Sequence, residues 1–597
     1  MLGCSEDACT MRKIHIRPCP ATPVIDSWAI SGQYCGKTNF LQPHPLTLRP
    51  YLDKILQMIE RQVLHLLPFA LLFCININEV FMTKTFLQKD RTPDWVVANN
   101  PNMGPKNAQP EQVHLAMHGP DKYIVTWATH SDPGHSYVTY GVDGRIDDNR
   151  VEAQSTYFHE KGGILDVLYV HHATIEGIKP GVVYTYRVGS DYGFSHILRF
   201  KGLEERPDGG YKVAVYGDFG YENARSIAPL TNLAQTGGID LVMHVGDMAY
   251  NLDIRGDPFM RMIEPIASTV PYMVSPGNHE MEMIPYHNYI YRYNMPNSYD
   301  NHYYSYDLGK AHIISFSTEF YYDFYSGIVK GLVQQQYEWL ENDLQKANAN
   351  RKNVPWIITL GHRPMYCSTD DGDDCRNKEA RVRVGWKSHY GLEALFYKYG
   401  VDLEVWAHEH TYERLYPTYD RQVYDGAESP YVDPPAPVHI ISGSAGCNEN
   451  TDQFVKNPEP WSAFRSTNYG FSLMQVHNDT HLHWQQVKAA DKSIEDDLWI
   501  IKRKHAPYSK RDLLKLKRNS RFVPYGKAER WHEYDLKQQT DPVQSMRIDA
   551  TPKIVNKCAD YGIEVQHKPG VEQIRKSECC CSCECKELVK VCPIELI

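Results

Sequence analysis

The stretch IDLVMHVGDMAY, residues 239–250, indicates the fold class of the longest part of this chain. Its first seven residues are almost all apolar, as in a parallel β-strand buried on both faces, and we interpret His244 within it as a core residue. The run ends at Gly246, and Asp247 and Tyr250 follow. Because ligands bind outside the carboxyl ends of parallel strands, Asp247 and Tyr250 are candidate site residues.

Similar apolar runs recur after residue 210 and alternate with segments of helical length, such as GLVQQQYEWLENDLQKAN. The runs are YKVAVY, VPYMVS, AHIISFS, PWIITL, VDLEVW and VHIISG. Buried strands that alternate with helices predict an α/β domain, which we place at residues 210–508.

Residues 108–203 have a different pattern, in which short β-like runs such as KYIVTWAT and VLYVHHATIEGI are separated by turn residues. This spacing predicts a small all-β sandwich. The stretch GIKPGVVYTYRVGS, residues 177–190, resembles a loop and strand of fibronectin type III-like domains. No cluster of histidines and carboxylates recurs in this sequence segment, so we expect a structural or interaction role for it.

Composition limits the classes of function. The chain has 597 residues, of which 42% are hydrophobic and 12% aromatic, so it is long enough for two or more packed domains. The formal net charge is −10, and no basic stripe interrupts the middle of the sequence. We therefore expect no nucleic-acid partner.

The amino-terminal part carries a targeting signal in this interpretation. The apolar run VLHLLPFALLFCINI, residues 63–77, is short for a membrane span but suits the core of a secretory signal, which we place at residues 58–80. Residues 1–57 are then an extension or a gene-model artefact, and a signal anchor or a buried helix is the alternative. The sequon NDT at Asn478 is a candidate glycosylation site. We expect a secreted or lysosomal protein without a stable membrane span.

The fifteen cysteines are unevenly placed, with five before residue 75 and seven after residue 557. Cys367 and Cys375 bracket the acidic stretch STDDGDD, and a local disulfide is favoured there over a metal site. The tail, residues 509–597, is basic and then cysteine-dense, and it is assigned to no domain. Zinc binding there is an alternative, but CCCSCECKE lacks the paired spacing of zinc fingers, which favours disorder or an artefact.

Polar residues follow the predicted strands one after another. They occur in YGDFG (Asp218), VGDMAY (Asp247, Tyr250), PGNHE (Asn278, His279), LGHRP (His362) and AHEH (His408, His410). Together these side chains offer oxygen and nitrogen donors that suit two ions of iron, zinc or manganese. A carboxylate such as Asp247 can bridge two cations about 3.5–4 Å apart, a spacing at which both bind one phosphate.

The order GDxG, GDxxY, GNHE, GHRP, AHEH resembles the purple acid phosphatases, a branch of the calcineurin-like metallophosphoesterases. The resemblance extends over about residues 108–508. It implies an α/β metallophosphoesterase sandwich, with two mixed β-sheets flanked by helices, preceded by the fibronectin type III-like domain. It also implies a role for each ligand: Asp218, Tyr250 and His410 bind Fe(III), Asn278, His362 and His408 bind a divalent ion (Zn, Fe or Mn), and Asp247 bridges them.

Tyr250 separates this family from the protein Ser/Thr phosphatases, which have an Asp-Arg pair where this chain has Ala249 and Tyr250 and a histidine where it has Gly220. A tyrosinate ligand gives the family its purple colour. The segment PWSAFRSTNYGFSLMQV, residues 460–476, also resembles the family, and HRPMYCS resembles its animal branch, the type 7 acid phosphatases.

The chain departs from the family pattern in two places. Ala407 replaces the usual glycine before His408, which is harmless because this residue donates no side chain to the site. Thr369, Asp370 and Asp371 stand where plant members have a histidine pair. Acidic side chains there would repel an anionic substrate unless they point away, so the phosphate contacts and the substrate preference stay open.

The chemistry that the resemblance implies is hydrolysis of phosphate monoesters. A trivalent and a divalent cation lower the pKa of bound water, and the resulting hydroxide attacks phosphorus in line. His279 is predicted to be the general acid or a phosphate contact, and the alternative is that it only orients its neighbours. Glu280 is predicted to support the ligands.

We therefore predict an acid phosphatase acting on small phosphate esters, with phosphoproteins as a further substrate class. The alternatives are a phosphodiesterase that uses the same metals and, from another class, a non-catalytic secreted binding protein. Relatives form dimers, so a homodimer is compatible with the resemblance.

Overall fold

The computed structural model describes residues 107–159, 167–281, 287–322, 329–386, 389–426 and 429–519. All of them belong to one compact unit. The predictions for residues 1–57 and 58–80 and for the cysteine-dense tail lie outside the described residues.

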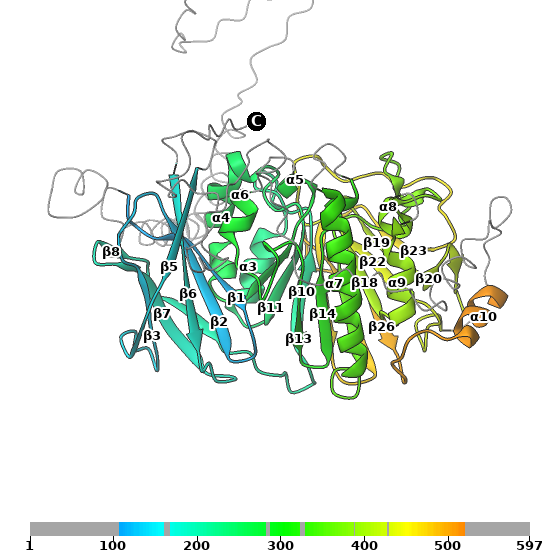
Figure 1. Ribbon diagram of the computed structural model, residues 1–597, viewed down its shortest axis with the longest axis horizontal. Helices are drawn as coiled ribbons and strands as arrows, with labels where there is room; N and C mark the ends of the chain where they lie inside the picture. The colour runs from blue at the N-terminus through cyan, green and yellow to red at the C-terminus, as the bar shows by residue number, and fades with distance from the viewer. Residues whose placement is uncertain are drawn as a thin grey trace, which may run out of the picture. The chain divides into compact units, whose positions relative to one another are not determined.

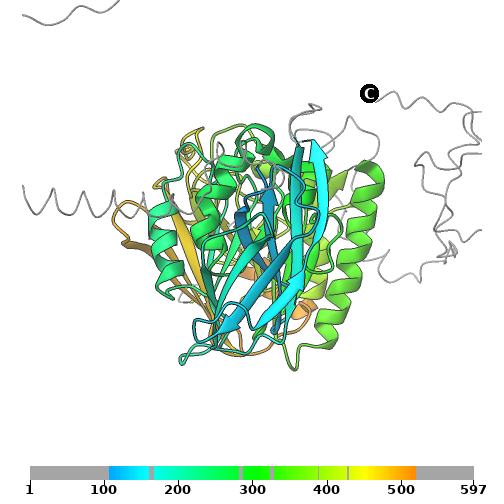
Figure 2. The same ribbon diagram turned by 90° about the vertical axis from the view of Figure 1, so that its left-hand side faces the viewer.

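The first described domain is an antiparallel β-sandwich (Figures 1 and 2). One sheet has the order β1 (Glu111–Met117), β2 (Lys122–Thr129), β6 (Val167–Glu176), β5 (Gln154–His159). The other has the order β4 (Asn149–Glu152), β3 (Tyr137–Val142), β7 (Val183–Ser190), β8 (Gly193–Phe194), and β9 (Leu198–Lys201) also pairs with β7. Trp127, Tyr123 and Tyr186 are fully buried and fill the space between the sheets.

Two mixed sheets form the second domain. The six-stranded sheet has the order β12 (Tyr272–Ser275), β11 (Leu241–Val245), β10 (Lys212–Tyr216), β24 (Gly470–Val476), β25 (His481–Lys488), β26 (Ile494–Ile501). The seven-stranded sheet has the order β13 (Tyr304–Leu308), β14 (Ala311–Ser315), β15 (Trp356–Leu360), β18 (Leu403–Trp406), β22 (Val438–Ser442), β19 (Tyr412–Leu415), β23 (Ser462–Ser466). Strands β12, β11 and β10 run parallel, and so do β14, β15, β18 and β22. The other neighbours in both sheets pair antiparallel. The predicted fold class is confirmed.

Helices cover the outer face of each sheet (Figure 1). Apolar side chains of α3 (Ile227–Gln235) and α4 (Leu252–Ala267) pack with the six-stranded sheet. Those of α7 (Val329–Ala349) and α9 (Leu392–Tyr399) pack with the seven-stranded sheet. The shorter elements are α5 (Asn278–Met281), α6 (His287–Arg292), α8 (Arg381–Val384), the 3₁₀ turns Glu319–Tyr321 and Asp374–Arg376, and the strand pairs β16 (Gly385–Trp386) with β17 (His389–Tyr390) and β20 (Thr418–Tyr419) with β21 (Gln422–Val423).

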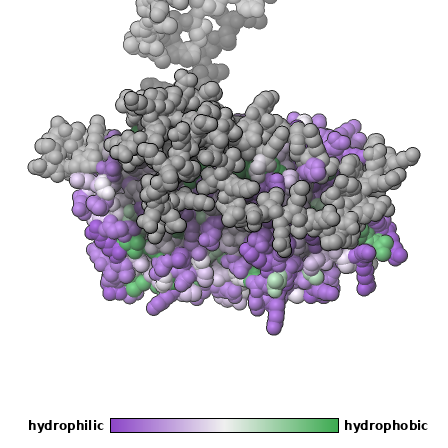
Figure 3. Space-filling model, in the orientation of Figure 1, coloured by the Kyte–Doolittle hydropathy of each residue, from purple (hydrophilic) through white to green (hydrophobic). Residues whose placement is uncertain are grey.

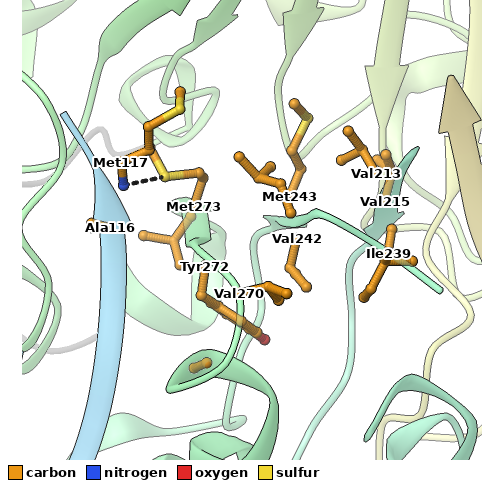
Figure 4. Close-up of a cluster of buried hydrophobic side chains, with 14 of the residues drawn as sticks. Ala116, Met117, Val213, Val215, Ile239, Val242, Met243, Val270, Tyr272 and Met273 are labelled. Carbon is orange, nitrogen blue, oxygen red and sulfur yellow. Dashed lines mark hydrogen bonds between the residues drawn. The ribbon is translucent and has the colours of Figure 1, made fainter. Parts of the chain in front are cut away.

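The β-sandwich is packed directly against the six-stranded sheet. Figure 4 shows Ala116 and Met117 of β1 beside Met273 and Tyr272 of β12, and the backbone N–H of Met117 lies 3.4 Å from the sulfur of Met273. These side chains belong to one buried cluster that extends through both domains. Burial of this apolar surface stabilises the contact between the domains.

A charged network lies beside this apolar contact, and we call it the junction network. His130 Nε2 lies 3.1 Å from Glu111 Oε1 and 3.3 Å from Asp257 Oδ2 of α4. Arg292 of α6 pairs with Asp257 at 3.0 Å, and Arg261 pairs with both carboxylates. Two guanidinium groups therefore compensate the two acids.

The described chain continues beyond the domain boundary predicted at residue 508. Helix α10 (Lys510–Asn519) places Leu516 in a buried cluster with Tyr397, Tyr419 and Tyr424. The first residues of the predicted tail therefore pack on the second domain. The surface seen in Figure 3 is mostly hydrophilic with small hydrophobic patches, and among the described residues no helix is both long and apolar enough to cross a membrane.

Candidate metal centre

The predicted site residues meet where parallel strands of both sheets end. Asp218 follows β10, Asp247 follows β11, Asn278 begins α5 after β12, His362 follows β15 and His408 follows β18. The backbone turns sharply at these ends, since Asp218, Asp247 and His408 have φ values of 55°, 51° and 70°. Such strained turns at strand ends are typical of functional sites. Here they place side chains from the two sheets side by side.

One group of donors surrounds His362. Its Nε2 lies 3.2 Å from Asn278 Oδ1, 3.3 Å from Asp247 Oδ2 and 3.2 Å from His408 Nδ1. Its Nδ1 lies 2.9 Å from the carbonyl oxygen of Val245. Because a carbonyl only accepts, Nδ1 carries a proton, and Nε2 is the ring nitrogen that faces the other donors and can bind a metal when it is deprotonated.

A second group surrounds Tyr250. Its hydroxyl lies 2.7 Å from His410 Nε2 and 3.3 Å from Asp218 Oδ1, and His410 Nε2 lies 3.5 Å from the same carboxylate oxygen. His410 Nδ1 donates to the carbonyl of Asn450, so Nε2 is again the inward nitrogen. All three side chains are buried.

The charges of these buried groups constrain one another strongly. Burial raises the pKa of the Asp247 carboxyl, but the imidazoles of His362, His279 and His408 hold it far below its usual range. Burial lowers the pKa of His362, whereas Asp247 and Asp218 raise it to about 10. Burial and the nearby carboxylates raise the pKa of Tyr250 well above its usual value.

These properties fit metal ions. Carboxylates, inward-facing imidazole nitrogens, an amide oxygen and a phenol are the mixed donors that iron and zinc bind. A multiply charged cation among them would compensate the carboxylates and favour the phenolate. Asp247 contacts His362 of the first group and lies beside His279, whose ring packs on Tyr250 of the second group.

The loop that carries Asp247 is held from behind by Glu280. Its carboxylate accepts hydrogen bonds from the backbone N–H groups of Asp247, Met248 and Gly277 at 2.8–2.9 Å. A Cβ on Gly277 would lie only 2.2 Å from Asp247 Oδ1, so only glycine fits there. Glu280 therefore supports the ligand in the way that the sequence suggested.

His279 lies at the edge of the donor groups and is partly exposed. Its backbone N–H donates to Asp247 Oδ1 at 2.9 Å, and its ring packs on Tyr250 with centroids 4.4 Å apart. Its Nε2 lies 3.8 Å from Glu449 Oε1, a contact that no motif signalled. The ring is thus placed beside the donors, where it can meet a substrate. His244, in contrast, is buried in β11 and bonds Tyr272, as a core residue does.

The acidic stretch between Cys367 and Cys375 packs beside the proposed ligands. A disulfide joins the two cysteines. The hydroxyl of Thr369 donates to the buried Glu409, while Asp370 is exposed. The stretch therefore packs on the AHEH segment, and its residue Asp373 contacts His408. The sequence analysis assigned no role to Asp373 or to its partner Arg363.

Fold and site together define a metallophosphoesterase, and comparisons with known proteins agree. The family model described as calcineurin-like phosphoesterase matches residues 211–412. The purple acid phosphatase N-terminal domain matches residues 110–202, and the iron/zinc purple acid phosphatase-like protein C matches residues 436–497.

The chain belongs to the purple acid phosphatase family. It is similar to acid phosphatase type 7 of Homo sapiens, with 48% identity over 413 residues that cover 67% of this chain and 93% of that protein. Acid phosphatase type 7 of Danio rerio is 44% identical over 417 residues, or 68% of this chain and 94% of that protein. The predicted family is confirmed, and the chain is an enzyme.

Among solved structures, the purple acid phosphatase PPD1 from yellow lupin (Lupinus luteus) seeds has the same fold. Its TM-score is 0.56 at 24% identity, and the match covers 71% of this chain and 78% of that one. The iron/zinc description of the family implies a dinuclear metal centre.

Proposed function

We propose that this enzyme is an acid phosphatase that hydrolyses phosphate monoesters at a dinuclear Fe(III)–M(II) centre, in which M is zinc, iron or manganese. The observation that carries the proposal is the Asp247 carboxylate, which contacts His362 of one group of donors and lies beside His279, whose ring packs on Tyr250 of the other group. The curated relatives named acid phosphatase support the reaction class.

Each ligand has a proposed role. Asp218, Tyr250 and His410 would hold Fe(III), Asn278, His362 and His408 would hold the divalent ion, and Asp247 would contact both. When bound, the two cations supply a hydroxide nucleophile at acidic pH and neutralise the phosphate oxygens.

His279 is the proposed general acid. Its Nε2 lies beside Asp247 and Glu449, at the partly exposed edge of the donor groups. An imidazolium there can donate its Nε2 proton to the leaving alkoxide oxygen. The contact with Tyr250 fixes the plane of the ring.

We also propose that the enzyme works in a secretory compartment, either outside the cell or in the lysosome. The disulfide between Cys367 and Cys375 supports this because such bonds persist in oxidising environments. Asn478 is exposed in the turn between β24 and β25, and its side-chain oxygen accepts from the Thr480 hydroxyl at 3.0 Å. An acceptor sequon in an exposed turn suits glycosylation.

The test is Tyr250→Phe, compared with Tyr216→Phe as the control. Tyr216 is a buried core residue that bonds Tyr272. We expect the purified protein to absorb in the visible range through a ferric tyrosinate, Tyr250→Phe to lose this band, and Tyr216→Phe to keep it. Far-UV circular dichroism checks that both variants fold. A band that survives Tyr250→Phe would contradict the ligand assignment.

A further inference from the structure

The loop of residues 367–375 contacts the proposed metal ligand His408 and the residue that follows it, Glu409. Asp373 contacts the ring of His408, and Thr369 donates to the adjacent Glu409. The disulfide that closes the loop is buried, since Cys367 and Cys375 are 0% and 2% exposed. The loop is therefore anchored in the core while its acidic part lies against the AHEH segment.

The two ring nitrogens of His408 have different environments. Nδ1 lies 3.2 Å from His362 Nε2, the ring nitrogen that faces the donor groups. Nε2 points away from them and meets the carboxylate of Asp373. When Nδ1 of a neutral imidazole binds a metal, Nε2 carries the proton, and this N–H can donate to Asp373.

Arg363 fixes Asp373 from the other side. Its Nη1 lies 3.5 Å from Asp373 Oδ2 and 2.8 Å from His408 Nε2. A guanidinium has only donors, so it can donate to Asp373 or to an unprotonated Nε2. When Nδ1 binds a metal and Nε2 carries the proton, only the carboxylate can accept from Arg363. Arg363 is itself held by Glu319, 2.9 Å from its Nε.

The backbone of His408 is held as firmly as its ring. Its N–H donates to Asp218 Oδ2 at 2.8 Å, in a left-handed conformation with φ of 70°. Asp218 therefore fixes the main chain and Asp373 the ring orientation. Partners of this kind, which hydrogen-bond the outer nitrogen of a metal-binding histidine, raise its basicity and orient it.

We propose that Asp373 is a positioning residue for His408 and sets the affinity of the divalent half of the centre. The proposal rests on the proposed dinuclear site. It gives the acidic loop, which replaces the plant histidine pair, a function in metal retention.

The experiment compares metal retention by the full-length enzyme and by three variants. Asp373→Ala removes the acceptor, and Asp373→Asn keeps an oxygen that can accept from Nε2–H. Asp370→Asn is the matched control, since this acid lies in the same loop, is 70% exposed in its side chain and is 3.8 Å from Arg376. Each protein is dialysed against rising concentrations of a chelator, and iron and zinc are measured by mass spectrometry together with the visible spectrum.

We expect Asp373→Ala to bind the divalent ion about 10- to 100-fold more weakly, the usual effect of losing such a partner. Iron content and the visible band of Asp373→Ala should stay at the wild-type level. The affinity of Asp373→Asn for the divalent ion should lie between those of Asp373→Ala and the wild type, and that of Asp370→Asn should equal the wild-type affinity. Wild-type divalent affinity in Asp373→Ala would overturn the inference, and so would an equal loss of both metals. A wild-type enzyme that holds no metal pair would instead overturn the proposed function and, with it, this inference.

Discussion

Among the described residues, two of the clusters that combine carboxylates with imidazoles lie in different surroundings. One is the proposed metal centre, with Asp247, His362 and His408, and the other is the junction network, with Glu111, His130 and Asp257. In both, the ligand-type atoms lie within 4.8 Å of one another. Residue type and spacing alone therefore do not distinguish a metal site from an ion network.

The difference lies in what compensates the negative charge. In the junction network the acids pair with Arg261 and Arg292 as well as with His130. In the metal centre, Asp218 and Asp247 contact histidine and tyrosine side chains and backbone amides. The inward Nε2 atoms of His362 and His410 there can bind a cation when it takes the place of their protons. In the junction network, Arg261 and Arg292 already balance the negative charge of the carboxylates. In the other cluster, carboxylates and inward-facing imidazole nitrogens form a set of ligands that suits a metal ion.

The largest expected effect separates the two clusters directly. Asp247→Asn should lower kcat by more than about 10³-fold, because the carboxylate proposed to hold both cations is lost. The isosteric change in the junction network, Asp257→Asn, should leave kcat within about twofold and lower the free energy of unfolding instead, because a buried pair is broken. Steady-state kinetics and urea unfolding of both variants measure this. Equal losses of kcat would show that the clusters are not functionally distinct.

A smaller effect is expected at the edge of the centre. His279→Ala should lower kcat by about 10²-fold for an alkyl phosphate, whose leaving group needs a proton, and by less for nitrophenyl phosphate. Exposed His135 provides the control, His135→Ala, which should change neither rate. If both substrates lose activity equally, His279 is a phosphate contact and not a general acid.

The smallest effect concerns the pH dependence of stability at the junction network. Burial raises the pKa of Glu111, but His130 and Arg261 lower it from 4.5 to about 2. Asp257 and Glu111 raise the pKa of His130 from 6.5 to about 10, against the effect of burial. The stabilisation by Glu111 is complete above the pKa of its carboxyl in the unfolded chain, 4.5, and is lost as the pH falls toward 2. The stabilisation by His130 is complete below the pKa of its imidazole in the unfolded chain, 6.5, and is lost as the pH rises toward 10.

The junction network should therefore contribute most between pH 4.5 and 6.5, the interval between the two unfolded values. Glu111→Gln should cost about 2–4 kcal/mol of unfolding free energy there and less at pH 3 and pH 9. Urea midpoints across this range measure it. The exposed pair of Lys122 and Glu176 gives the control Glu176→Gln, with little effect at any pH. A cost that does not depend on pH would contradict the assignment.

The sequence predicted the buried strands and the site residues that directly follow them. Apolar runs ending in Asp218, Asp247 or His362 identify both a buried strand and a side chain at its carboxyl end, because the fold brings parallel strand ends together. The order of the motifs then identified the family. These predictions need only local pattern and one topological rule.

Residues that act through loop packing were not predicted. Asp373 contacts His408, and Glu449 lies beside His279, because irregular loops bring them together. The spacing of apolar residues in the sequence does not predict the path of such loops. In the sequence, most of the β-sandwich lies between Glu111 and Asp257. Their shared contact with His130 therefore depends on how the two domains pack. Helix α10 is short and basic, so the sequence pattern did not show that Leu516 and the partly buried Leu513 pack against a cluster of tyrosines.

The most direct test of the central claim is anomalous X-ray diffraction from crystals of the enzyme, collected at the iron and zinc absorption edges. We expect two peaks on either side of the Asp247 carboxylate, with iron beside Tyr250 and the divalent ion beside His362, and none among Glu111, His130 and Asp257. One peak or none at Asp247, or a peak within the junction network, would contradict the view that charge compensation decides which cluster holds metal.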